Sequence, residues 1–231
     1  MEIGPGLGFL TTKLAQKVKK VIAIELDPKL YNTLKESIKK QNIKNIEIIN
    51  ADILQYFFKL NLEHYKIVSN LPYNITSIFL RKVFELKNKP KSMTLMLQKE
   101  VAERISAKPS KLSVLAISVQ LYCLPKIIEI IPKNYFWPEP KVNSAIIYFD
   151  IKNNNASYFL DKDQEKKFFR LVKVGFSSKR KMLKNNLASG FRITTKQAED
   201  IIKKAEFNEK VRAQELSIAD WEKLLSLINL E

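Results

Sequence analysis

Three glycines at alternate positions near the start of the chain have the spacing of a ligand-binding turn. They lie in the segment Glu2-Ile3-Gly4-Pro5-Gly6-Leu7-Gly8, just before a helix predicted to begin near Phe9. Glycine permits a tight turn and lets a bound group come close to the main chain. Glu25 lies at the end of the next predicted strand, and an acidic residue about 20 residues after such a turn is placed to accept hydrogen bonds from ribose hydroxyls. The pattern therefore predicts a ligand that carries a ribose.

Polar side chains at the ends of the following predicted strands complete this candidate binding site. The three ends carry Glu25, Asp52 and Asn70. Ligands of an open α/β sheet bind at the carboxyl ends of its strands, so these side chains and the glycine turn should share one crevice. We expect the cofactor to be held by Glu2, Gly4, Gly6, Gly8, Glu25, Leu26, Asp52, Ile53 and Asn70. The alternative is that the glycines only permit a turn and that Glu25 and Asp52 cap helices.

The first two thirds of the sequence alternates segments of strand and helix character. Strands are predicted over residues 21–26, 46–49, 66–69 and 92–98, with helices beginning at Asp27-Pro28 and covering 77–86 and 99–106. Residues 127–131 and 144–149 should form an antiparallel pair across a Pro-rich turn. Alternation of this kind predicts a mainly parallel sheet that is covered by helices on both faces.

The pattern changes after Asp150. Residues 152–157 (KNNNAS) are polar and typical of a linker, and helical spacing of apolar residues begins after Asp161. We therefore predict two domains. They are an α/β domain over residues 1–151 and a small all-α domain over residues 158–231.

Composition favours a nucleic-acid partner but does not establish one. The net charge is +16, and excess positive charge attracts polyanions. However, 34 of the 40 basic residues are Lys, and a general bias toward Lys would give the same charge without any function. No apolar run is long enough to cross a bilayer, so no membrane association is expected.

Several other chemistries are excluded by the residues that the chain lacks. Its single His, His64, and single Cys, Cys123, cannot supply a metal cluster, a Ser-His-Asp triad or a Cys-His pair, so we expect no metal. No G-x-x-x-x-G-K-[ST] phosphate-binding loop is present. One cysteine also excludes an internal disulfide and fits a reducing, cytoplasmic location.

The glycine segment and Asn70-Leu71-Pro72-Tyr73 resemble two motifs of methyltransferases. E-x-G-x-G-x-G resembles the first motif of class I enzymes, whose cofactor is S-adenosylmethionine. N-L-P-Y is similar to the catalytic motif of rRNA adenine dimethylases. The resemblance implies that the Asn70 side-chain oxygen and the Leu71 carbonyl accept the N–H groups of an adenine amine, which makes its nitrogen more nucleophilic. Pro72 would stiffen the turn, and Tyr73 would stack on the extruded base. The alternative is a turn that only ends a strand.

A Pro-rich segment offers a second aromatic for the same base. The segment is Phe136-Trp137-Pro138-Glu139-Pro140-Lys141-Val142-Asn143-Ser144, and it resembles the F-x-P-x-P-x-V-x-S motif. The resemblance implies that Phe136 packs against the flipped base, with Trp137 as the alternative packing residue.

Three further segments narrow the resemblance to the KsgA/RsmA family of small-subunit rRNA adenine dimethyltransferases. They are M-L-Q-K-E-V-A-E-R (96–104), F-S-S-K-R-K-M-L-K-N-N-L (176–187) and R-A-Q-E-L-S (212–217). The family implies a Rossmann-like catalytic domain, a helical domain that helps to hold rRNA, and dimethylation of two adjacent adenines of small-subunit rRNA during ribosome maturation. We expect a monomer. We also expect phosphate contacts from Lys179, Arg180, Lys181 and Lys184, unless these side chains form only a solvated face.

Two expectations bear on activity. The sequence begins inside the first motif, so we expect an N-terminally truncated member of the family whose first strand is incomplete. The alternative functions are an adenine N6-methyltransferase for large-subunit rRNA or DNA, and a non-catalytic RNA-binding assembly factor that has kept the fold.

Overall fold

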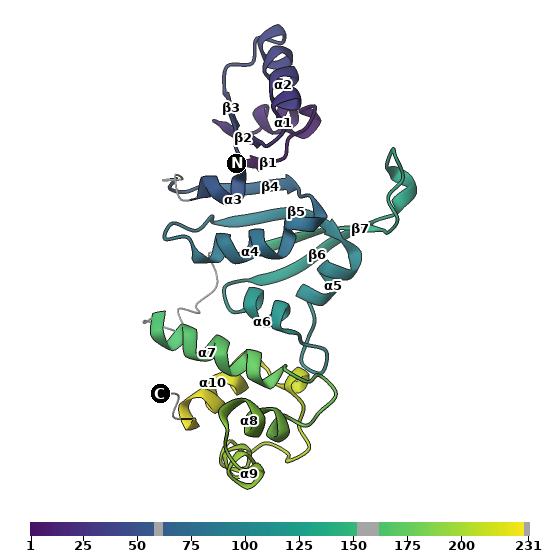
Figure 1. The fold of residues 1–231 in the computed structure, drawn as a ribbon. Helices are drawn as coiled ribbons and strands as arrows, with labels where there is room; N and C mark the ends of the chain where they lie inside the picture. The colour runs from purple at the N-terminus through teal and green to yellow at the C-terminus, as the bar shows by residue number, and fades with distance from the viewer. Residues whose placement is uncertain (58–61, 152–161, 229–231) are drawn as a thin grey trace. The chain divides into compact units, whose positions relative to one another are not determined.

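A mixed sheet organises the first part of the chain (Figure 1). The computed structural model describes residues 1–57, 62–151 and 162–228, and within these residues the sheet has seven strands in the order β3-β2-β1-β4-β5-β7-β6. The strands are β1 (Glu2–Ile3), β2 (Val21–Glu25), β3 (Ile46–Asn50), β4 (Lys66–Asn70), β5 (Ser92–Gln98), β6 (Leu124–Ile131) and β7 (Ser144–Asp150). Strands β1 to β5 are parallel, and β7 is antiparallel to both β5 and β6. The predicted Rossmann-like sheet and its antiparallel pair are therefore confirmed.

Helices connect the parallel strands, as the alternation of patterns predicted. They are α1 (Phe9–Ala15), α2 (Pro28–Lys40), α3 (Ile53–Tyr56) and α4 (Thr76–Glu85), and α5 (Lys99–Ile105) follows the last parallel strand, β5. Helix α2 shows how the sequence sets these boundaries. Asp27 caps it by accepting hydrogen bonds from the backbone N–H groups of Lys29 and Leu30 at 2.7 and 3.3 Å, and Pro28 occupies its first turn. Its buried residues, Leu34 and Ile38, lie on the side that packs against β2 and β3.

The second compact unit is helical and has its own core. Its helices are α6 (Val114–Gln120), α7 (Lys162–Gly175), α8 (Leu183–Phe191), α9 (Thr195–Lys204) and α10 (Ile218–Leu227), with the short turn η4 (Ala213–Glu215). Trp221 is fully buried at its centre and stacks on Phe176, with ring centroids 5.9 Å apart. Hydrogen-bonded capping boxes begin α9 at Thr194 and α10 at Ser217.

The division between the units differs from the predicted one at residues 103–122. The first unit contains Met1–Ala102 and Cys123–Asn153, and the second contains Glu103–Tyr122 and Asn154–Glu231. The reason is α6, whose buried residues Ala116 and Ile117 belong to the same apolar core as α7, α8 and α10. The predicted linker, residues 152–157, lies outside the described residues.

No helix in residues 1–57, 62–151 and 162–228 is both long enough and apolar enough to cross a membrane.

Candidate active site

The glycine turn is fastened to the end of β2 by the Glu25 carboxylate. Glu25 is only 6% exposed, and its two oxygens accept hydrogen bonds from the backbone N–H groups of Gly6 and Asp27, each at 3.0 Å. Gly6 has φ +57°, a conformation that suits glycine, and a Cβ there would meet open space. A carboxylate has about four lone-pair sites, so Glu25 can accept further hydrogen bonds from a ligand in that space.

Gly8 has a packing role in the same turn. It precedes α1 with φ +86°, and a Cβ there would lie 2.2 Å from Cδ1 of the buried Leu34. The close approach of α2 to the glycine turn therefore accounts for this glycine without a ligand. The backbone of Gly4 instead faces the second motif, because a Cβ at Gly4 would be 3.8 Å from Cδ of Pro72.

The ends of β2 and β3 are held side by side by Asn50. Its side-chain N–H groups donate to the carbonyl oxygens of Glu25 at 2.9 Å and Leu26 at 3.2 Å. Leu26 is consequently presented at the strand end with 67% of its surface exposed. Asp52 caps α3 through a 2.8 Å hydrogen bond from the Leu54 N–H, so the alternative reading of Asp52 as a helix cap is correct for its Oδ1 atom. Ile53, the first residue of that helix, is buried.

Glu2 is a buried acidic residue on the strand that precedes the glycine turn. It lies on β1 with 2% of its surface exposed, and burial raises the pKa of its carboxyl. Its Oε2 atom has no well-aligned hydrogen-bond donor among the described residues, although the hydroxyl of Thr11 lies close enough to oppose the rise in pKa. A buried carboxylate oxygen without a donor is costly, and a cationic ligand would satisfy it. The expected cofactor carries an ammonium and a sulfonium group, so Glu2 and Glu25 fit it.

The Asn70-Leu71-Pro72-Tyr73 segment leaves the carboxyl end of β4 and forms a turn. Asn70 and Pro72 are exposed, whereas Leu71 is 1% exposed and anchors the turn in the core. The Tyr73 hydroxyl shares a 2.7 Å hydrogen bond with the hydroxyl of Ser144, which is fully buried at the start of β7. The ring of Tyr73 is therefore tied to the sheet, 71 residues away in sequence.

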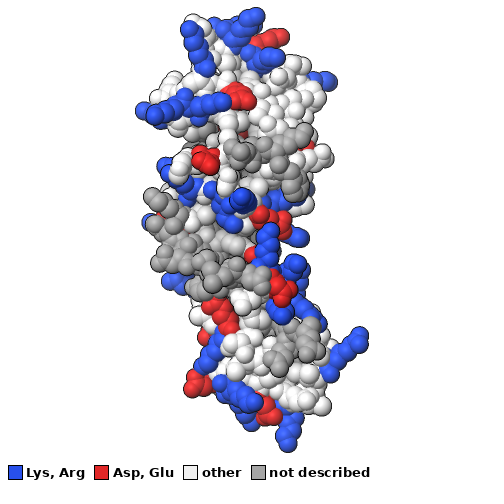
Figure 2. Space-filling view, turned by 90° about the vertical axis from the view of Figure 1, so that its left-hand side faces the viewer, with Lys and Arg blue, Asp and Glu red and all other residues white. Residues whose placement is uncertain are grey.

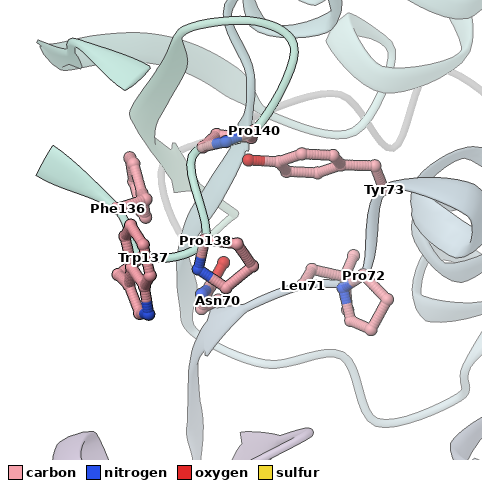
Figure 3. Close-up of a pocket in the computed structure, with 8 residues that line it drawn as sticks. All are labelled: Asn70, Leu71, Pro72, Tyr73, Phe136, Trp137, Pro138 and Pro140. Carbon is pink, nitrogen blue, oxygen red and sulfur yellow. The ribbon is translucent and has the colours of Figure 1, made fainter. Parts of the chain in front are cut away.

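These residues border an open pocket of about 330 Å³, within the size range of small-molecule sites. Tyr73 lies on one side, and Phe136 and Trp137 lie on the other (Figure 3). The residues that line it are Asn70, Leu71, Pro72, Tyr73, Phe136, Trp137, Pro138 and Pro140. The structure thus brings together all five residues predicted to act on the substrate. Phe136 is half-buried and Trp137 is exposed, which makes Phe136 the better packed of the two aromatics.

The predicted basic cluster lies between α7 and α8. Lys179, Arg180 and Lys181 are exposed in the turn that joins these helices. Lys184 differs, because its ammonium group forms a 3.1 Å ion pair with Glu199 of α9 and its side chain is 18% exposed. Hydrogen bonds from Lys184 and Lys203 lower the pKa of Glu199 to about 2. Three of the four predicted phosphate contacts are therefore presented to solvent, and Lys184 already has an anionic partner.

The basic turn is held in place by buried residues of the helical unit. Asn186 is 3% exposed, and its side-chain amide donates to the carbonyl oxygens of Gly175 at 2.5 Å and Ser178 at 3.1 Å. A Cβ at Gly175 would lie 2.2 Å from the ring of Trp221, so only glycine fits at the end of α7. Elsewhere, Lys and Arg side chains are spread over the face of the molecule drawn in Figure 2, so surface charge alone does not single out this turn.

Two residues at the site were not predicted from the sequence, Asn50 and Ser144, and both act through hydrogen bonds to distant segments. Trp137, which also lines the pocket, was predicted only as the alternative to Phe136. Ser144 could have been identified as a site residue from its position at the end of the F-x-P-x-P-x-V-x-S motif. His64 is exposed and Cys123 is buried, and burial raises the pKa of the Cys123 thiol.

Comparison with known proteins agrees with this geometry. The family model for ribosomal RNA adenine dimethylase matches residues 1–230. A ribosomal RNA small subunit methyltransferase A of Dehalococcoides mccartyi is 39% identical over 227 residues, which are 97% of this chain and 76% of that protein.

Two solved structures share the fold. A dimethyladenosine transferase from Plasmodium falciparum superposes with a TM-score of 0.80 at 28% identity, covering 96% of this chain and 86% of that one. The 23S rRNA methyltransferase ErmE gives a TM-score of 0.76 at 24% identity, covering 99% and 90%, and shows the fold alone. The chain therefore belongs to the ribosomal RNA adenine dimethylase family of S-adenosylmethionine-dependent methyltransferases.

Proposed function

We propose that this protein transfers methyl groups to the N6 amines of two adjacent adenines in small-subunit rRNA. The observation that carries the proposal is the open pocket that joins Asn70 and Tyr73 to Phe136, next to a glycine turn whose Gly4 faces Pro72. The similarity to small-subunit methyltransferases supports this substrate over large-subunit rRNA or DNA.

The residues of the glycine turn and the strand ends are the proposed cofactor site. S-adenosylmethionine, when bound, supplies an electrophilic methyl group on a sulfonium. Glu25 would accept hydrogen bonds from the ribose with the lone pairs that Gly6 and Asp27 leave free. The partnerless oxygen of Glu2 would face the positive charge. Asp52 and its neighbours Leu26 and Ile53 would border the adenine.

We expect Glu25→Ala to weaken cofactor affinity about 10-fold or more. The reason is that a hydrogen bond to a charged group contributes about 1.5–3 kcal/mol. Affinity for S-adenosylhomocysteine is measured by calorimetry, after circular dichroism has confirmed folding. Glu47→Ala is the matched control, since Glu47 is a half-exposed carboxylate on neighbouring β3 that pairs with Lys20. Unchanged affinity in a folded Glu25→Ala protein would remove Glu25 from the site.

The proposed chemistry depends on acceptors aimed at the adenine amine. Its lone pair is delocalised into the ring, which makes it a poor nucleophile. If the Asn70 side-chain oxygen and the Leu71 carbonyl accept its N–H groups, the nitrogen is held in a more tetrahedral form with its lone pair free to react. This is catalysis by positioning and preorganised electrostatics, without a strong base. Leu71, which is buried, fixes both acceptors relative to β4.

The function is tested by methyl transfer to purified small ribosomal subunits, with large subunits and DNA as competing substrates. The expected product is N6,N6-dimethyladenosine in small-subunit rRNA. Asn70→Ala should bind RNA normally and lower the single-turnover rate about 100-fold or more, as removal of one preorganised hydrogen-bond partner does. Asn74→Ala, an exposed asparagine of the same turn, is the control and should keep the parental rate. A parental rate in Asn70→Ala would disprove the mechanism, and methylation confined to another substrate would disprove the assignment.

The proposed role of Tyr73 is to hold the extruded base, with Ser144 fixing the plane of its ring. Tyr73→Ala should lose most activity, because stacking contributes about 1–3 kcal/mol per base. Tyr73→Phe and Ser144→Ala should each lower the single-turnover rate by no more than about 10-fold, since each removes one neutral hydrogen bond. The double variant should be no slower than the slower single variant. If the rate losses of the two single variants add in the double variant, the two hydroxyls act independently. If both single variants lower the melting temperature equally and leave the rate unchanged, the hydrogen bond between the hydroxyls is purely structural.

We propose that the exposed basic turn contacts RNA phosphates. Replacing Lys179, Arg180 and Lys181 with Gln should weaken RNA binding and flatten the plot of log K against log salt by about one unit per lost contact. Lys184→Gln is the matched control, and it should leave the slope unchanged because Lys184 is paired with Glu199. RNA affinity is measured at several salt concentrations. An unaltered slope in the triple variant would identify the turn as a solvated surface.

A further inference from the structure

The turn between β6 and β7 carries two aromatic side chains that are almost fully exposed. Trp137 is 98% exposed and Tyr135 is 78% exposed, although Phe136 between them is half-buried. The segment extends away from the sheet (Figure 1). An indole ring left in water forgoes a large burial energy, so this pair of exposed aromatics suits a surface that a partner covers.

Trp137 lies beside the place where the substrate base would enter. It lines the same pocket as Asn70 and Tyr73, whereas Tyr135 does not. Figure 3 shows it next to Phe136, on the side away from Tyr73. Because nearly all of its surface is exposed, the ring borders the pocket and still offers most of its area to groups outside it.

Hydrogen bonds and an ion pair hold the backbone of this turn in place, so Trp137 lies on an ordered segment. The backbone N–H of Lys133 donates to the Asn143 side chain at 3.1 Å, and the Lys133 ammonium pairs with Glu139 at 2.6 Å. The N–H of Phe136 donates to the Lys133 carbonyl at 3.2 Å. A backbone fixed in this way loses little conformational entropy when the turn binds a ligand.

The proposed reaction exposes the face of a base on which this ring can stack. An adenine that enters the pocket leaves its stack, which costs a few kcal/mol and exposes the face of the neighbouring base. Aromatic side chains recover such energy by stacking on bases, and they do so whatever the base, because every base has a π face. The exposed Lys141 on the same turn and the net charge of +16 favour a polyanion over an apolar protein surface.

We propose that Trp137 stacks on the nucleotide next to the target adenine and holds it outside the pocket. The proposal rests on the proposed function, because it requires an adenine in the pocket formed by Asn70 and Tyr73. Because the two target adenines are adjacent, each of them is a neighbour of the other. Trp137 therefore contributes to RNA affinity and to the order of the strand at the pocket entrance, and it takes no part in the chemical step.

The test uses an RNA hairpin with two adjacent adenines and two matched hairpins, each abasic at one neighbour of the target. Trp137→Ala should weaken binding to the intact hairpin about fivefold or more, and Trp137→Phe, which keeps a stacking face, should recover most of it. Tyr135→Ala, from the same turn but outside the pocket lining, is the control and should bind like the parent. On one abasic hairpin the parent and Trp137→Ala should bind equally. 2-Aminopurine at that position should be quenched by the parent and not by Trp137→Ala.

Two results would overturn the proposal. One is an unchanged affinity of Trp137→Ala for the intact hairpin, and the other is an equal loss on the intact and both abasic hairpins. Failure of the proposed function looks different, because the parent itself would then leave adenines unmethylated. If the parent methylates adenine and Trp137→Ala binds RNA normally, the stacking contact alone is refuted. The exposed ring would then be assigned to contact with a protein partner.

Discussion

The Glu25 carboxylate is the interaction on which the geometry of the cofactor side depends. It is buried, and its hydrogen-bond donors are the backbone N–H groups of two separate segments, Gly6 of the glycine turn and Asp27 at the start of α2. A buried carboxylate without donors costs several kcal/mol, so both segments must approach the end of β2. The positive φ of Gly6 makes this approach possible, and the packing of Leu34 against Gly8 then sets the position of α2.

Local pattern was enough to predict most of the first unit. The strand over residues 92–98 and the capped start of α2 agree with the structure, because alternating burial and an Asp-Pro cap are encoded within a few residues. Residues 103–122, in contrast, were predicted to belong to the first domain, whereas they lie in the second unit of the structure. The partners of Ala116 and Ile117 lie in α7 and beyond, and no local pattern indicates such a contact. The hydrogen bond between Tyr73 and Ser144 is beyond prediction for the same reason.

The site residues show that one residue type can serve two roles. Asp52 has the position expected for a ligand contact, and it also caps α3. Gly8 belongs to the glycine motif, yet packing against Leu34 is sufficient to explain it. Lys184 shares a basic segment with Lys179 but is committed to an ion pair. Residue type and spacing therefore selected residues that the fold brings together at the strand ends, whereas the role of each residue depends on contacts that only the folded chain defines.

The two sides of the proposed substrate pocket belong to segments that the sheet itself connects. Tyr73 follows β4, and Phe136 precedes β7, while β4 and β7 both pair with β5. Ser144, the residue bound to Tyr73, pairs with Gln98 of β5 and Ile131 of β6, so the spacing across the pocket is fixed by strand register. An adenine amine must be positioned closely to react, and rigid strands provide that precision better than loops. The contacts that we propose for Lys179 and Trp137 only hold RNA, and exposed turns suit the looser placement that such contacts tolerate.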